Sequence, residues 1–493
     1  MNVPDYIQSE NKHENVEIQR LLFPVISERS DDPGLEHDTP PALRLPPDLV
    51  EAIFLHCFRN GTLSTSFPPK KRTATSLQLG QICRSWRNVA LCIPHIWASL
   101  SVDFDLMPSD NACDLLETWF SRSGERIPLS ITGSSISDRP DLMLTIFNYA
   151  HRWKYLNLSI PLSSLKPFAG QTSHDLFQTL ETVVLRFTSS TPVGQIPIFA
   201  GAPRLRTLLL PAAVNECHIP PDISYRDLPV FQWHQITHFV SGHGFTPVET
   251  LDFFTKCHNL VDCSIVISCK AGRYDQQTFG PTLATRMELK SLRKLQIRTW
   301  VEPGGLFPNL ALPALVDLEL SGPTYFFAGP LVRMIKESQC SLERFCLRDV
   351  ITWPAEITQC LREMPNLLEL ELSSPEEETI KEYLDDDALL QLTDSGLSPG
   401  GLLLPQLEVV KFGHTLYSGS SLLVDMFHSR WDLAREGGSA KQSMRLRRVE
   451  LEFPTRFNPI TGKAAERLAY MEAQGLEVST TISRTSPLSE LDV

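Results

Sequence analysis

The fold is decided by residues 313–322, Pro-Ala-Leu-Val-Asp-Leu-Glu-Leu-Ser-Gly, and by the other stretches that repeat their pattern. Leu318 and Leu320 alternate with acidic residues, which predicts a short strand with one buried face. Leu315 lies three residues before Leu318, on the turn that leads into the strand, and Pro313 marks the start of that turn. We expect the Leu315 side chain to enter the same core. The segment therefore predicts one unit of the form L-x-x-L-x-L.

The same pattern recurs along the chain, with other apolar residues in some positions. Successive copies mostly begin about 23 to 32 residues apart, close to the ~20–29 residue period of leucine-rich repeats. Two copies lie 40 and 39 residues after the preceding one, where we expect inserted loops. The first positions of the copies are Trp153, Leu180, Leu205, Leu228, Leu260, Leu292, Leu315, Leu342, Leu367, Leu407 and Leu446.

Helical patterns separate many of these strands, for example at 248–257, 331–336, 357–364 and 422–431. A single strand-and-helix unit cannot bury its own apolar face, but stacked units can. The sequence therefore predicts an α/β solenoid of short parallel strands, with strands on one side and helices on the other. Any parallel α/β domain would also contain scattered Leu-x-Leu strands. The recurrent Pro-x-Leu lead-in, as in Pro203-Arg204-Leu205, favours the solenoid.

The region before the repeats predicts a pair of helices. Residues 45–58, Leu-Pro-Pro-Asp-Leu-Val-Glu-Ala-Ile-Phe-Leu-His-Cys-Phe, place two prolines at a helix start and apolar residues at helical spacing. A second apolar-patterned segment covers 76–97 and contains Ile-Cys-Arg-Ser-Trp-Arg at 82–87. A polar loop at 59–76 joins the two. We expect Trp97 to pack just beyond the proline that ends the second helix.

These residues, in this order and helix phase, resemble an F-box. That family opens with Leu-Pro, an acidic residue, an aliphatic residue and then Ile-Phe. It closes with an aliphatic-Cys-Arg-x-Trp-Arg run and a late Trp. The loop at 59–76 is longer than the family's short turn. Together with the stretch at 116–131, the split motif resembles F-box-like proteins of mushroom-type fungi.

The resemblance implies a protein that binds a SKP-family adaptor and, through it, a cullin. The chain would then be the substrate-recognition subunit of an SCF-type ubiquitin ligase, with an unknown protein target held by the repeats. It implies no catalytic residue, metal or other cofactor in this chain. The alternative left open is a non-catalytic interaction scaffold without ubiquitin transfer. The expected adaptor-binding residues are Leu45, Pro46, Leu49, Ile53, Phe54, Ile82, Cys83, Trp86 and Trp97.

The helix pair could also be an ordinary core closed within its own domain. However, residues 45–97 are too few to bury so many large apolar side chains alone, and a second surface is needed. That surface is the adaptor or the first repeats; we favour the adaptor for Leu45, Pro46, Leu49 and Ile53. The predicted organisation is an arm at 1–41, an F-box-like helical domain at 42–100, a solenoid at 101–483 and a tail at 484–493.

Composition narrows the classes of partner. A net charge of −13 gives no long-range attraction to phosphate backbones, so we expect no nucleic-acid binding. No apolar run approaches the ~20 residues of a membrane span, so we expect no membrane partner. Residues 1–20 do not resemble a signal peptide, and the 11 cysteines lack a framework spacing. We therefore expect an intracellular protein of the cytoplasm or nucleus, monomeric apart from its complex.

Several constellations could in principle carry chemistry. His234 and His238 are four apart, and three cysteines follow at 257, 263 and 269, but neither spacing is typical of zinc sites. The sequence at 242–244, Gly-His-Gly, predicts a turn. The acidic runs at 376–378 and 385–387 predict a solvated loop. Because no nucleophile elbow, P-loop or H-E-x-x-H occurs, an enzyme is the less favoured alternative.

Overall fold

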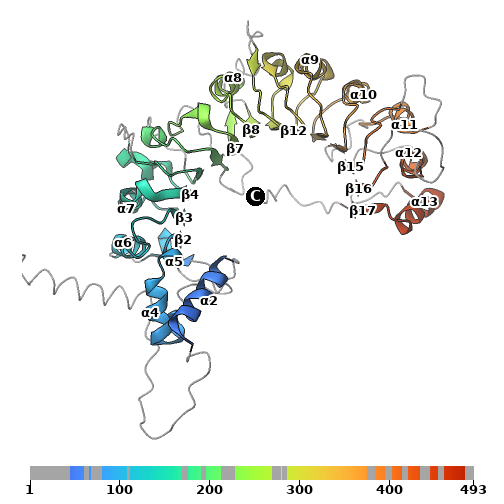
Figure 1. Ribbon diagram of the computed structural model, residues 1–493. Coiled ribbons are helices and arrows are strands. Elements are labelled where there is room, and N and C mark those ends of the chain that lie inside the picture. The colour runs from blue at the N-terminus through green and yellow to red at the C-terminus, as the bar shows by residue number, and fades with distance from the viewer. Residues whose placement is uncertain are drawn as a thin grey trace, which may run out of the picture. The chain divides into compact units, whose positions relative to one another are not determined.

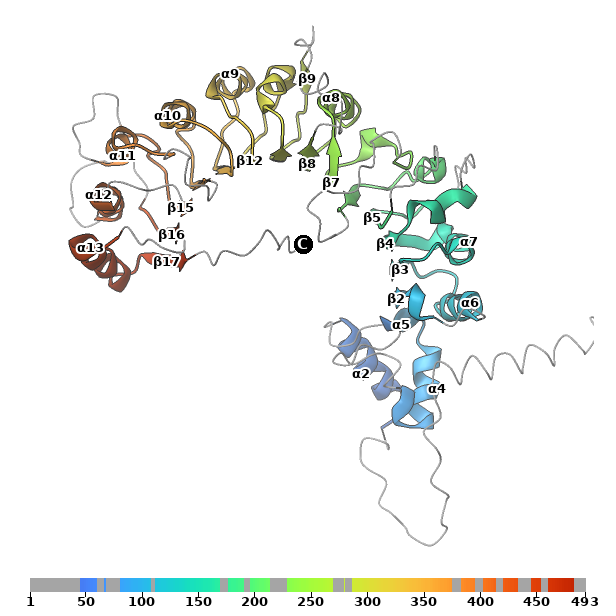
Figure 2. The same cartoon turned by 180° about the vertical axis from the view of Figure 1, so that it is seen from behind.

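A computed structural model describes the larger part of the chain (Figures 1 and 2). The described residues are 45–59, 66–67, 80–107, 111–168, 176–189, 196–212, 228–268, 279, 286–374, 383–394, 402–413, 420–432, 445–453 and 460–482. The predicted arm at 1–41, the tail at 484–493 and most of the loop at 59–76 lie outside them. The chain forms two compact units. One contains Met1–Leu209 with Arg226–Gln232, and the other contains Leu210–Tyr225 with Trp233–Val493.

Short helices open the described part of the first unit. They are α2 (Pro47–Arg59), α4 (Arg84–Cys92) and α5 (Pro94–Trp97). Proline at the first position of α2 and of α5 removes an N–H that has no partner inside a helix, which explains why both helices begin there. Phe54 of α2 packs edge-on against Trp86 of α4, with ring centroids 5.5 Å apart.

Parallel strands form the rest of the first unit. Their order in the sheet follows the sequence, from β1 to β6. They are β1 (Ser66–Phe67), β2 (Ser99–Asp103), β3 (Leu129–Ser134), β4 (Trp153–Ile160), β5 (Thr182–Phe187) and β6 (Thr207–Leu210). The helices α6 (Ala112–Arg122) and α7 (Pro140–Asn148) connect successive strands, which confirms the predicted alternation. Strand β1 lies within the predicted polar loop and pairs with β2.

The second unit repeats the alternation of strand and helix. Its strands are β7 (His238–Phe245), β8 (Asp262–Ile267), β10 (Lys294–Thr299), β12 (Asp317–Ser321), β13 (Arg344–Arg348), β14 (Glu369–Ser373), β15 (Val409–Gly413), β16 (Arg448–Phe453) and β17 (Glu477–Ile482). Its helices are α8 (Pro247–Lys256), α9 (Ala328–Ser338), α10 (Pro354–Arg362), α11 (Asp386–Leu392), α12 (Ser420–Asp432) and α13 (Gly462–Ala473). The helices cover one face of the parallel strands (Figure 1).

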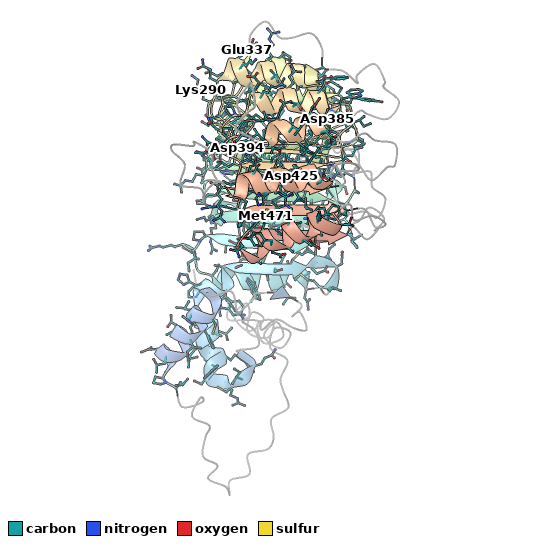
Figure 3. All side chains as sticks on the ribbon, turned by 90° about the vertical axis from the view of Figure 1, so that its right-hand side faces the viewer. Lys290, Glu337, Asp385, Asp394, Asp425 and Met471 are labelled. Atoms are coloured by element: carbon teal, nitrogen blue, oxygen red, sulfur yellow. The ribbon has the colours of Figure 1, made fainter. Side chains whose placement is uncertain are left out.

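Helices and strands of the second unit advance together in chain order. Glu337, Asp425 and Met471 mark α9, α12 and α13, which follow one another along the stack (Figure 3). From β8 to β17 the strands pair in strict register, so that Leu318 lies opposite Phe345 and Phe345 opposite Leu370. Both leucines and the phenylalanine are fully buried. The unit is therefore a solenoid-like α/β fold whose core is a row of equivalent apolar positions.

One predicted repeat is wrong. The copy at Leu228 has no strand, because residues Trp233–Gln235 form a 3₁₀ turn and β7 begins only at His238. The buried pair Ile236 and Phe239 occupies the expected positions instead. Conversely, Trp97, Leu100 and Val102 form an unpredicted copy whose strand is β2, and all three are buried.

Two local predictions need correction. Gly242 and Gly244 lie in β7, where the register with β8 shifts, and not in a turn. A Cβ at Gly242 would stand 2.3 Å from the backbone nitrogen of Ala212, so close approach of another backbone explains the glycine. Asp385 does not belong to a loop: its carboxylate accepts the Ala388 N–H at 2.8 Å and caps α11. The following acidic residues lie in that helix's first turn, where negative charge is favourable.

Candidate functional site

The helix α2 presents apolar residues on two sides. Val50 and Phe54, four residues apart, are buried against the first unit. Leu49 and Ile53, also four apart, are 53% and 38% exposed. A surface helix needs only one apolar stripe to pack onto its own protein. The second stripe, Leu49 and Ile53, is therefore an unpartnered surface within the described part of the chain, and it is the candidate site.

The Ile-Cys-Arg-Ser-Trp-Arg run divides between structure and surface. The Cys83 thiol accepts the Trp86 N–H at 3.4 Å and so caps the start of α4. The Trp86 ring is buried beside Phe54, as described above. Ile82, directly before the capping cysteine, is 51% exposed. Cys83 and Trp86 therefore stabilise α4. Ile82 is the third large apolar side chain, after Leu49 and Ile53, that is exposed in this region.

Trp97 belongs to the interior of the first unit. Its indole N–H donates to the Ala90 carbonyl at 2.9 Å, and its ring meets that of Trp119 edge-on at 4.8 Å. The Arg122 guanidinium lies 4.8 Å from the Trp97 ring centroid. The side chain is consequently held from several sides by α4 and α6. Its spacing to Leu100 and Val102, which follows the repeat pattern, is the sequence signal that could have identified Trp97 as core.

The predicted site residues therefore form two groups. Phe54, Trp86 and Trp97 are buried in the described structure and cannot offer a surface to another protein. The exposed group consists of Pro46, Leu49, Ile53 and Ile82, with Leu45 and Cys83 half-buried. The buried group fixes the geometry of α2 and α4, and the exposed group is what a partner could contact.

A second surface lies on the strand face of the second unit that the helices leave uncovered. Arg344 of β13 reaches carboxylates on both neighbouring strands. Its Nη1 is 2.9 Å from Asp317 Oδ1 and 3.4 Å from Glu319 Oε2, while Nη2 is 3.2 Å from Glu371 Oε2. Its Nε is 3.4 Å from Glu369 Oε1. Asp317, Arg344 and Glu369 lie opposite one another across the three strands, and Glu319 and Glu371 lie two residues further along, so opposite charges pair across strands.

Two more cations complete this charged face. Arg348 bridges Glu319 and Glu371 at 2.7 and 2.6 Å, and Lys411 of β15 lies 3.0 Å from Glu369. Burial alone would raise the pKa of Glu369, but hydrogen bonding and charge from Lys411 and Arg344 outweigh it and lower that pKa. The carboxylates outnumber the cations in the cluster around Arg344. The face is therefore internally paired with a small negative excess.

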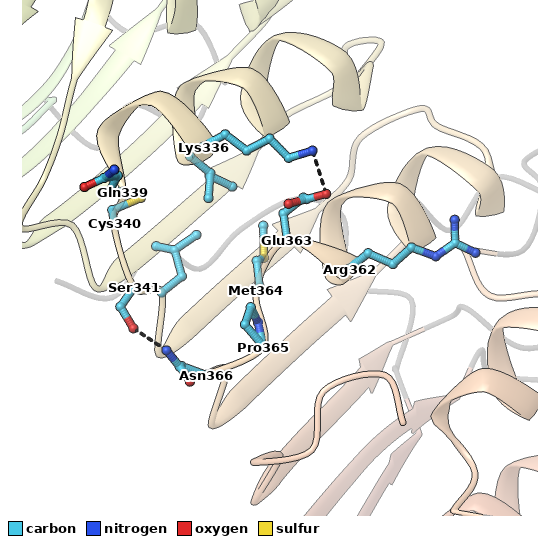
Figure 4. Close-up of a pocket in the computed structure, with 11 residues that line it drawn as sticks. Lys336, Gln339, Cys340, Ser341, Arg362, Glu363, Met364, Pro365 and Asn366 are labelled. Atoms are coloured by element: carbon cyan, nitrogen blue, oxygen red, sulfur yellow. Dashed lines mark hydrogen bonds and ion pairs between the residues drawn. The ribbon is translucent and has the colours of Figure 1, made fainter. Parts of the chain in front are cut away.

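A crevice of about 310 Å³ lies where α9 and α10 end and their following strands begin (Figure 4). Its rim is tied by the ion pair of Lys336 with Glu363 at 2.9 Å and by the Asn366 amide donating to Ser341 at 2.9 Å. Burial raises the pKa of the Cys340 thiol in this crevice to about 11, so the thiol is protonated at neutral pH. The crevice is a gap between adjacent repeats. Its one cysteine, Cys340, is not activated as a nucleophile.

The histidines and cysteines considered as metal ligands do not come together in the described structure. The His234 ring lies 6.5 Å from that of His258, while His238 contacts the Thr237 hydroxyl. Cys257 and Cys263 are buried, and burial raises the pKa of both thiols; Cys269 lies outside the described residues. In the part of the chain that the structure describes, no three His, Cys, Asp or Glu side chains are grouped to hold a metal ion.

Two further findings bear on the site. Among the described helices, none combines the length and apolarity needed to cross a bilayer. No known protein-family model matches the chain, and no curated protein matches its sequence.

Proposed function

We propose that the chain is the substrate-recognition subunit of an SCF-type ubiquitin ligase, which binds a SKP-family adaptor through α2 and the residues around Ile82. The single observation that carries the proposal is the exposed stripe of Leu49 and Ile53 on a helix that already buries Val50 and Phe54. A hydrophobic surface on the adaptor would cover that stripe. Apolar area removed from water stabilises such a contact by about 25 cal/mol per Å².

The sequence motif supports the same assignment. The exposed residues Pro46, Leu49 and Ile53 are among those that the F-box resemblance assigns to the adaptor. The motif residues Cys83 and Trp86 build the supporting helix. A protein contact needs an exposed apolar surface on an element that is held in place. Leu49 and Ile53 supply the exposed surface, and the buried Trp86 holds the helices together.

In this proposal the chain contributes proximity and no chemistry of its own. A target held by the repeats would be tethered to a complex that carries the ubiquitin-conjugating enzyme. Tethering turns a bimolecular encounter into one governed by effective concentration, which reaches the millimolar range for short flexible links. The catalytic groups belong to the partner enzymes. Co-purification of a cullin with the chain would separate this function from that of a scaffold that binds the adaptor alone.

The test is a pull-down of purified adaptor with the full chain and with the variant Leu49→Asp/Ile53→Asp. Two carboxylates on the exposed stripe would have to be desolvated on binding, which costs several kcal/mol per buried charge. We expect adaptor binding to be lost while the circular dichroism spectrum and the melting temperature stay close to those of the wild type.

Leu144→Asp is the matched control, because Leu144 is an exposed leucine on the helix α7 of the same unit. It should bind the adaptor as the wild type does. Retention of the adaptor by Leu49→Asp/Ile53→Asp, or equal loss in Leu144→Asp, would overturn the assignment of this face.

A further inference from the structure

Arginine recurs at one position of the repeats, on three different strands. Arg186, Arg298 and Arg348 are each the fifth residue of their strands, which are β5, β10 and β13. The residues on either side of Arg186 in the sequence, Leu185 and Phe187, are buried in the core. Because side chains alternate along a strand, Arg186 lies on the strand face that the helices leave uncovered.

Two of these three guanidinium groups have a partner on the strand face. Arg348 contacts the carboxylates of Glu319 and Glu371 at 2.7 and 2.6 Å. Arg298 lies 5.2 Å from the ring centroid of Trp300, which follows it by two residues. The residue in that place after Arg186 is Thr188, which offers neither a carboxylate nor a ring.

The strands beside Arg186 do not supply a counter-charge. The row of residues that pair across β2 to β5 at this level contains Asp103, Ser134, Ser159 and Arg186. The adjacent row, with Thr132 and Asn157, is uncharged. Asp103 is three strands away, or ~14 Å at the usual strand spacing. That separation exceeds the Debye length of ~8 Å at physiological ionic strength, so Asp103 does not neutralise Arg186.

Two polar atoms at this place lack a hydrogen-bond partner. Arg186 Nε and Thr188 Oγ1 are both buried, and neither is hydrogen-bonded within the described part of the chain. The Thr188 N–H donates to the Ile160 carbonyl at 3.0 Å, so the backbone stays extended and Thr188 lies on the same side as Arg186. Buried polar groups in folded proteins almost always have a partner. Two unpartnered groups on one side of one strand mark a place that a ligand can complete.

The chemistry of these groups selects an oxyanion. The planar guanidinium group donates in a fork that matches the oxygens of a carboxylate or a phosphate, and a hydroxyl group donates to the same oxygens. The whole chain has a net charge of −13, which repels a polyanion such as a nucleic acid. A single acidic group on a protein segment fits both the local positive charge and the overall negative one.

We propose that Arg186, with Thr188 and Ser159, binds one oxyanion, a carboxylate or a phosphate, on the strand face of the first unit. The inference rests on the proposed function in one respect, since the oxyanion would belong to the target that the repeats hold. The site lies on β5, and its test needs no adaptor. Its failure is therefore distinguishable from failure of the adaptor contact on α2.

The test is a nuclear magnetic resonance titration of the full chain labelled with ¹⁵N-arginine. Sodium phosphate or sodium acetate is added at constant ionic strength and pH, and the side-chain Nε–H signals are followed. Arg186→Lys and Arg298→Lys identify the two signals by their loss. We expect the Arg186 signal to shift and saturate with at least one anion. Arg298 is the internal control, because it occupies the same strand position beside Trp300, and its signal should not saturate.

Threonine variants test whether Thr188 takes part. Thr188→Val removes the hydroxyl group and keeps the side chain's shape, so the dissociation constant read from the Arg186 signal should rise severalfold. Thr188→Ser keeps the hydroxyl group and should bind nearly as the wild type does. Thr182→Val is the matched control, because Thr182 lies on the same face of β5 four residues before Arg186. It should leave the dissociation constant unchanged.

The outcomes decide the proposal and the source of the oxyanion. Saturation with phosphate alone assigns the site to a phosphate group, and saturation with acetate alone assigns it to a carboxylate. An Arg186 signal that responds to neither anion, or that drifts without saturating as the Arg298 signal does, would overturn the proposal. Equal dissociation constants for the wild type and Thr188→Val would do the same. If Arg186→Lys does not fold, the comparison of Thr188→Val with Thr182→Val on the saturating signal decides.

Discussion

Arg344 shows how single residues stabilise the strand face of the second unit. Its guanidinium contacts the carboxylates of Asp317, Glu319, Glu369 and Glu371, which come from the two neighbouring strands. Half-buried networks of this kind contribute more than isolated surface pairs, because each charge has several partners at once. The opposite charges on neighbouring strands therefore have a structural role.

Glu369 provides a test of that network through pH. Its pKa is lowered in the folded protein, where Lys411 and Arg344 outweigh the effect of burial. A lowered folded-state pKa contributes stability above the unfolded-state value of about 4.3, and this contribution is lost as pH falls through the folded value. We expect Glu369→Gln to reduce the free energy of unfolding by about 1 kcal/mol at pH 7, with little effect near pH 3.

Urea unfolding at pH 7 and at pH 3 would measure the difference. Glu343→Gln, at an exposed position just before β13, should change stability little at either pH. A loss of stability in Glu369→Gln that is the same at both values would mean that the carboxylate's charge does not contribute.

Residue-level motifs were only partly informative about the site. The Cys-Arg-x-Trp run correctly indicated a helix, but its Cys83 serves as a cap and its Trp86 as core. Spacing alone cannot tell an inward-facing apolar residue from an outward-facing one when both stripes of a helix are apolar. Only the packing of Phe54 on Trp86 decides which stripe of α2 faces out.

At the scale of elements, α2 allows the two stripes of one helix to be compared directly. Leu49→Gln/Ile53→Gln changes exposed positions, and we expect the free energy of unfolding to stay within about 0.5 kcal/mol of the wild type. Val50→Gln/Phe54→Gln changes fully buried positions and should cost more than about 4 kcal/mol. Equal destabilisation by the two variants in urea unfolding would show that the outer stripe is also packed within the chain.

Strands were predictable wherever the repeat pattern was regular. From β12 to β14 the period is short and each strand follows its helix directly, so position and register were both predicted from the sequence. The pattern failed at Leu228, because a 3₁₀ turn there imitates the apolar spacing of a strand. It missed β2, because Trp97, the first position of that copy, also fitted the motif of the preceding helix pair. Short apolar runs have this ambiguity until tertiary contacts resolve it.

At the scale of the whole molecule, the two compact units present different kinds of surface. The first offers the apolar stripe of α2 together with Ile82, and the second offers the charged strand face around Arg344. A division of this kind suits a protein whose function is to connect two others.

Hydrogen exchange of the full chain with and without purified SKP-family adaptor would locate the adaptor contact. We expect slower amide exchange in α2 and in the residues around Ile82, with the strands β7 to β17 unchanged. Protection that appears only in the strands of the second unit, or no change anywhere at saturating adaptor, would contradict the assignment of α2 as the surface that another protein completes.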